Sequence, residues 1–207
     1  EVLDRLASRK DQDARRQLAA LTAAAGELNQ LTSRIESLAR EAAAAAQAND
    51  PQKRQLQRLT KDAKRLAEEV AELARKLERL QAKKPGESLK KAGSSLGNTS
   101  QAAAGGDGDS AEKQARSALE DLQKAKQELQ QNIQAAQEDL VREQLARLET
   151  ELAGLLKRQQ NLLSESQRLE AVKKTNNGNL NRAQQASLRS LAEEQRQLAE
   201  AVQQSSE

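Results

Sequence analysis

Carboxylate pairs are the groupings in this sequence whose residue types and spacing could do chemistry. Paired carboxylates can act as general acid and base or hold a metal ion, but metal sites in helical bundles normally combine them with histidine in a Glu-x-x-His motif. The 207 residues contain no His, Cys or Tyr. We therefore interpret the pairs as solvated flanks of helices and predict no catalytic, cofactor-binding or metal-ligating residue. The pairs are Glu68 with Glu69, Glu149 with Glu151, and Glu193 with Glu194.

The segment Asp107–Asp109 is the second chemical candidate, because it begins like a calcium-binding loop. An EF-hand also needs an acidic residue at its fifth position and Glu at its twelfth, where this sequence has Ala111 and Ala118. We interpret the segment as a turn. Asp109 with Glu112 then resembles the capping box of a following helix.

Positive charge is concentrated in residues 51–91, which contain 13 basic and 6 acidic residues, while the whole chain has a net charge of +3. Such an excess could bind the phosphates of nucleic acid or of an anionic membrane. The chain has no aromatic residue to stack on bases or to enter a membrane interface. We favour basic side chains that face more acidic helices of the same chain, and keep binding to nucleic acid or anionic lipid as the alternative.

Composition predicts the elements that must carry these groups. Ala, Leu, Gln, Glu, Lys and Arg, which all favour helices, dominate a chain with only two prolines. The 31 Leu, 5 Val and 2 Ile are few for a large globular core, but the near balance of charge argues against disorder. We expect an all-α protein of long amphipathic helices, packed as antiparallel coiled-coil hairpins or as an elongated helical bundle.

A heptad pattern predicts a two-helix segment over residues 1–84, with helices at about 2–48 and 51–84. Apolar residues alternate at spacings of three and four, which requires a partner helix to cover them. Asp50 and Pro51 are the expected start of the second helix, and Pro85 with Gly86 its expected end. Alanines near the end of the first helix, such as Ala42, predict a tight helix contact. The second seam is Leu56, Leu59, Ala63, Leu66, Val70, Leu73, Leu77 and Leu80.

The rest of the chain is predicted to begin with a linker and to continue as two helices. Residues 85–110 are rich in Gly and Ser, and we predict a linker with room for a short helix, in which the chain reverses. A long helix at about 111–174 and a final helix at about 182–204 should follow. Asn181 with Gln184 is the expected capping box of the final helix.

The predicted long helix carries two apolar seams that are out of phase, which predicts a local unwinding or a change of partner near Val141. The first seam is Leu119, Leu122, Leu129, Ile133, Ala136 and Leu140, and the second is Leu145, Leu148, Leu152, Leu155, Leu162 and Leu169. Polar residues also occupy seam positions, where they can fix the register of pairing or mark a frayed, wet seam. Both interpretations stay open. These residues are Gln159, Ser166 and Gln195.

Two stretches, Ala118–Leu129 and Leu188–Leu198, resemble the Gln-, Ala- and Glu-rich helical regions of large membrane-anchored bacterial envelope proteins of unknown function. The resemblance implies an extracytoplasmic bacterial location, with membrane anchors outside these residues. It carries over no functional residue. Because the chain contains no Met, we also expect it to be a piece of a longer polypeptide.

Together these patterns predict a non-enzymatic structural scaffold, spacer or protein-interaction segment that acts through helix pairing. The expected partners are other helices of the same or another chain, a homo-oligomer included, and no small-molecule substrate. The leucine seams do not distinguish parallel from antiparallel pairing. The compartment stays open apart from what the resemblance implies.

Overall fold

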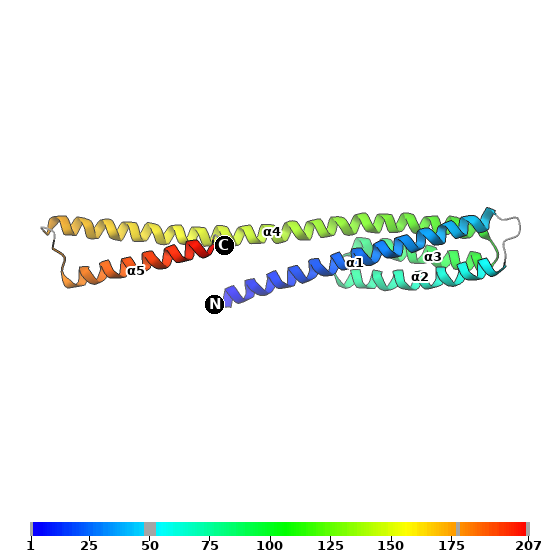
Figure 1. Ribbon diagram of the computed structural model, residues 1–207, viewed down its shortest axis with the longest axis horizontal. Helices are drawn as coiled ribbons and strands as arrows, with labels where there is room; N and C mark the ends of the chain where they lie inside the picture. The colour runs from blue at the N-terminus through cyan, green and yellow to red at the C-terminus, as the bar shows by residue number, and fades with distance from the viewer. Residues whose placement is uncertain (1, 48–52, 177–178, 206–207) are drawn as a thin grey trace. The chain divides into compact units, whose positions relative to one another are not determined.

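The computed structural model describes residues 2–47, 53–176 and 179–205. Within these ranges it contains five α-helices and no strand, which confirms the all-α prediction (Figure 1). The chain divides into two compact units, residues 1–140 and 141–207, and α4 contributes to both. The helices are α1 (Val2–Gln47), α2 (Lys53–Arg79), α3 (Lys83–Ala104), α4 (Gly108–Thr175) and α5 (Arg182–Ser205).

The first unit is a four-helix bundle of α1, α2, α3 and the beginning of α4 (Figure 1). Cross-helix contacts show that α1 and α2 are antiparallel: Glu27 pairs with Lys76 and Arg34 with Glu69, so residue numbers rise along α1 as they fall along α2. All four helices contribute to one core, since their seam residues can leave water only together. Its largest fully buried aliphatic side chains are Leu28, Ile35, Leu59, Val70, Leu77, Leu89, Leu96, Leu122 and Leu129.

Two predictions are wrong in this region: the linker at 85–110 and the end of the second helix at residue 84. Most of the predicted linker belongs to helix α3. Helix α2 ends at Arg79, and Gln81, with φ of 62°, lies in the turn that follows. Pro85 is the third residue of α3, inside the first turn, where a missing N–H removes no helical hydrogen bond. Leu89 and its neighbours at spacings of three and four form a buried seam that closes against α2. The seam is Leu89, Ala92, Leu96, Thr99 and Ala103.

The reversal between α3 and α4 is made by residues 105–107, where Gly106 has φ of 83°. The cap of α4 is Asp107 and not the predicted Asp109, because Ser110 donates its backbone N–H to Asp107 Oδ1 at 2.9 Å. Glycine at the start of this helix lets α1 approach closely: a Cβ on Gly108 would lie 3.1 Å from backbone atoms of Ala46, which is tighter than an ordinary contact. The tight contact predicted for the alanine-rich end of α1 is therefore confirmed.

The second unit consists of α4 from Val141 onward and α5, which folds back along it (Figure 1). The predicted capping box of α5 is confirmed: Asn181 N–H donates to Gln184 Oε1 at 2.9 Å and Gln184 N–H donates to Asn181 Oδ1 at 2.8 Å. The unit boundary coincides with the predicted change of partner near Val141, and α4 continues through it as a helix.

The predicted start of the second helix at Asp50 and Pro51 lies outside the described residues. No helix in the described ranges is long and apolar enough to cross a membrane.

Candidate interaction surface

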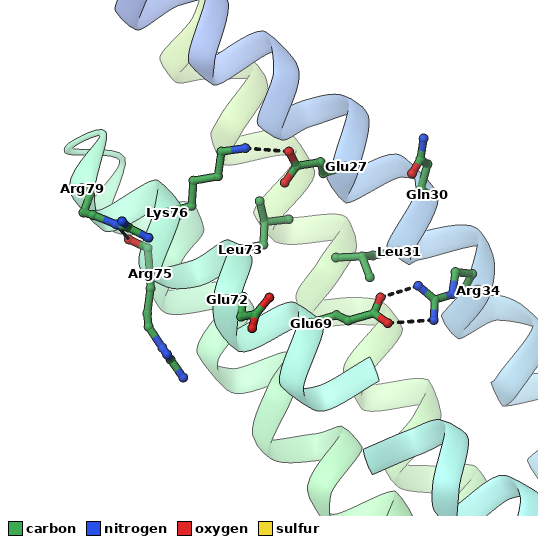
Figure 2. Close-up of a pocket in the computed structure, with 10 residues that line it drawn as sticks. All are labelled: Glu27, Gln30, Leu31, Arg34, Glu69, Glu72, Leu73, Arg75, Lys76 and Arg79. Atoms are coloured by element: carbon green, nitrogen blue, oxygen red, sulfur yellow. Dashed lines mark hydrogen bonds and ion pairs between the residues drawn. The ribbon is translucent and has the colours of Figure 1, made fainter. Parts of the chain in front are cut away.

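Ion pairs set the register of the α1–α2 seam on its solvent side (Figure 2). Lys76 Nζ lies 2.6 Å from Glu27 Oε1. One heptad away, the guanidinium of Arg34 donates two hydrogen bonds to the Glu69 carboxylate, from Nη1 and from Nη2. Leu31 and Leu73, both buried, lie between the two pairs. The ion pairs and the buried leucines are therefore compatible with the same register of α1 against α2.

The Arg34–Glu69 pair changes the acid–base behaviour of both partners. Hydrogen bonds from Arg34 hold the pKa of Glu69 below its ordinary value, and Arg65 Nε, 3.1 Å from Oε1, acts in the same direction. The same hydrogen bonds raise the pKa of Arg34. Both groups thus stay charged through the neutral range, which keeps the cross-helix pair formed.

The surface between these pairs is a groove of about 520 Å³ with charged walls. Besides the four paired side chains, Glu72, Arg75 and Arg79 line it. It contains no nucleophile or histidine, and its most buried charges already neutralise one another. We interpret the groove as the rim of a helix seam.

The basic residues of 51–91 only partly follow our interpretation that they face more acidic helices. Lys76 reaches Glu27 of α1, as expected, whereas Lys90 pairs with Glu78 and Arg65 with Glu69, both inside the basic region. A row of basic residues at spacings of four, three and four remains exposed on α2. The row is Arg54, Arg58, Lys61 and Arg65.

The carboxylate candidates are not gathered into a site. Glu68, Glu149, Glu151 and both members of the Glu193–Glu194 pair are exposed. Glu69 is engaged by arginines, and Asp107 caps α4. In the part of the chain that the structure describes, no cluster of three His, Cys, Asp or Glu residues could hold a metal ion.

The second unit, in contrast, leaves large apolar side chains uncovered. Leu162, Leu169 and Leu198 are buried, so the hairpin of α4 and α5 has a closed seam. On the same helices, eight Leu and Val side chains are roughly half exposed. They are Val141, Leu145, Leu148, Leu152, Leu156, Leu163, Leu188 and Val202. This set is the candidate interaction surface.

Two exposed leucines of α4, Leu156 and Leu163, lie on a different stripe from its covered seam, whereas exposed Leu148 stands seven residues before Leu155 on that seam. Leu155, Leu162 and Leu169 follow the heptad spacing and become progressively covered by the hairpin. Leu156 and Leu163 directly follow two of these residues, and so lie about 100° further around the helix. The apolar sector of α4 is therefore wider than α5 alone can cover.

Part of this surface was missed by the heptad pattern. The predicted seam contains Leu145, Leu148 and Leu152 but neither Leu156 nor Leu163, and the signal that could have found them is the pair of doublets Leu155–Leu156 and Leu162–Leu163. The three polar seam residues, Gln159, Ser166 and Gln195, are all exposed, which favours the wet seam over a buried register lock.

Comparisons of this chain with protein-family models, curated proteins and solved structures found no match.

Proposed function

We propose that this chain is a non-enzymatic scaffold and protein-interaction segment that acts by pairing its helices with other helices. The bundle of residues 1–140 is the part that holds itself together, because its seams are closed. The hairpin of residues 141–207 is the part that binds other helices.

One observation carries the proposal: the half-exposed leucines and valines of the hairpin. Monomeric proteins rarely leave contiguous apolar area of this kind uncovered unless it binds something. The flanking residues are charged and helical, and the apolar positions recur on one side of a helix, so another amphipathic helix is the partner that fits. Leucine, not aromatic residues, makes up most of this surface, as in helix-to-helix seams.

A photo-reactive side chain at Leu152 tests the proposal in cells that produce the protein. The matched control carries the same group at Thr150, which is also exposed but points to the opposite side of α4. We expect adducts at Leu152 that mass spectrometry maps to a helix, either of this chain or of another protein. Equal adduct yields from the two positions, or none from Leu152, would contradict the proposal.

A second candidate function is binding to an anionic surface of lipid or nucleic acid, and the exposed row on α2 favours it. Arg54, Arg58 and Lys61 lie in line on the solvent face, where they could meet phosphates together. Retention on phosphatidylglycerol vesicles or on DNA should then fall with rising salt. It should also fall on changing these three residues to Gln, but not on changing Arg182, Arg189 and Arg196 of α5.

A further inference from the structure

Four leucines of the candidate interaction surface form a pattern that reads the same in both directions. Leu145, Leu152, Leu156 and Leu163 follow one another at spacings of seven, four and seven. Their exposed fractions are nearly equal, at 60%, 59%, 60% and 56%, so all four face solvent to the same degree. The pattern is symmetric about Gly154, with leucines two and nine residues away on each side.

These leucines lie on one straight line along α4. An α-helix makes about five full turns in 18 residues at 3.6 residues per turn, so Leu145 and Leu163 point in the same direction. Leu152 and Leu156 fall on either side of that direction, and Gly154 faces the opposite way. The line, which we call the symmetric stripe, is thus separate from the seam that α5 covers.

We propose that a second copy of this chain packs on the symmetric stripe in antiparallel orientation, with a two-fold axis at the level of Gly154. Leu145 of one copy then lies level with Leu163 of the other, and Leu152 with Leu156. This inference rests on the proposed function, because it identifies the partner of the same surface.

The symmetry itself points to a second copy. In a two-fold contact each surface must complement itself, so every apolar position needs an apolar position at the mirrored distance from the axis. A different partner protein would place no such requirement on this chain. The four equally exposed leucines meet that requirement, whereas Val141 and Leu148 of the candidate interaction surface stand opposite Gln167 and Gln160 and lie outside the stripe.

Charge favours the antiparallel orientation over the parallel one. Residues 141–153 contain three carboxylates and two arginines, for a net charge of −1, and residues 155–167 contain Lys157, Arg158 and Glu165, for a net charge of +1. An antiparallel copy brings each half against the half of opposite sign. A parallel copy would bring like against like.

Helix α5 adds to the same side of the hairpin. Its covered residue is Leu198, and its exposed Leu188 and Val202 are displaced from that seam in the same rotational sense as the symmetric stripe is from the seam of α4. In an antiparallel pair, displacement in the same sense places both exposed sets on one side of the pair. Two hairpins joined on this side would form a four-helix arrangement.

Spin labels on the full chain test the orientation directly, because the sequence has no native Cys to interfere. Single-label variants Asn161→Cys and Lys173→Cys change exposed residues off the stripe. In an antiparallel pair the two labels should be separated along the axis by roughly 21 Å for the first variant and roughly 57 Å for the second, at 1.5 Å rise per residue. A parallel, in-register pair would give nearly equal separations for both variants and would overturn the proposal.

Sedimentation equilibrium supplies the second measurement. The parent chain should form dimers, and the double variant Leu152→Glu with Leu156→Glu should weaken dimerisation by at least about 100-fold, since it places uncompensated charge in the contact. The control is Thr150→Glu with Asn161→Glu, which adds the same charge on the opposite side of the helix. Its dimerisation should change by less than about threefold, and circular dichroism should show equal helix content in all three chains.

A chain that stays monomeric, or a dimer that the Leu152→Glu with Leu156→Glu variant leaves intact, would overturn self-association. Neither result would contradict the proposed function if the photo-reactive group at Leu152 still forms an adduct with a helix of another protein. If that adduct is missing as well, the proposed function also fails.

Discussion

At the scale of single residues, the most specific interactions are those that fix how α1 lies against α2. The leucine seam alone tolerates a shift of one heptad, because the same pattern recurs every seven residues. The Arg34–Glu69 and Lys76–Glu27 pairs add charges that match in one register. Their contribution to stability is modest because all four side chains are partly exposed, so they select a register more than they stabilise it.

The lowered pKa of Glu69 makes one of these pairs testable by pH. A group whose pKa is lowered by folding contributes stability above its ordinary pKa, 4.5 for this carboxyl group, and loses it as the pH falls further. Glu69→Gln should therefore lower the free energy of unfolding at neutral pH by about 1 kcal/mol or less, given the partial exposure of the pair. The difference from the parent should narrow progressively below pH 4.5.

Urea unfolding followed by far-ultraviolet circular dichroism measures this difference, since the chain has no aromatic residue to report by fluorescence. The control Glu72→Gln removes another carboxylate of the same groove and should change stability by less than about 0.5 kcal/mol. A difference between Glu69→Gln and the parent that stays constant into acid would show that the pair does not act through charge.

At the scale of helices, the distance to a neighbouring backbone predicts opposite effects for the replacement of two glycines. Gly26 lies within α1, and a Cβ there would meet nothing within 4 Å, while a Cβ on Gly108 would meet the backbone of Ala46 at 3.1 Å. We expect Gly26→Ala to stabilise the protein by about 0.5–1 kcal/mol through helix propensity. Gly108→Ala should instead destabilise it by about 1 kcal/mol or more through overpacking. Thermal unfolding of the two variants side by side would show opposite shifts, and a stabilised Gly108→Ala chain would refute the close contact.

The sequence predicted those helices whose seams consist of large apolar residues. It did not predict α3, whose seam includes the smaller residues Ala92, Thr99 and Ala103. Helix α2 and the capping box at Asn181 follow from patterns that act locally. Helix α3 was missed because Pro85 and its glycines suggest a linker, although Pro85 lies in a first turn and Gly93 lies inside the helix next to α2, where a Cβ would make an ordinary contact 3.7 Å from Ala67 O. Whether Pro and Gly end a helix or allow it to pack closely depends on the neighbouring helix, which the local sequence pattern does not include.

The candidate interaction surface was half predictable for a related reason. A heptad search follows one seam, so it found Leu145 and Leu152 but passed over Leu156 and Leu163, which belong to a straight stripe with a different repeat. Which leucines stay exposed depends on the width of the face that α5 covers. That width is set by tertiary packing and not by spacing.

At the scale of the whole molecule, burial is divided unequally between the two units. The bundle of residues 1–140 shares one core among four helices, whereas the described part of 141–207 buries Leu162, Leu169 and Leu198 between two. Local opening is governed by how much apolar contact must be broken. The hairpin should therefore open at a lower free energy than the bundle.

Hydrogen exchange measured by mass spectrometry at two protein concentrations connects this difference to the proposed dimer. At low concentration, amides of α5 and of residues 145–163 should exchange faster than those around Leu66–Leu77, which lie in the bundle core. At high concentration a second copy would bind only the closed hairpin and so stabilise it by mass action. Exchange at 145–163 should then slow by tenfold or more, about 1.4 kcal/mol, while exchange in the bundle stays unchanged. Protection that rises equally in both units would mean that association does not use the symmetric stripe, and protection that never rises would mean that the hairpin closes without a second copy.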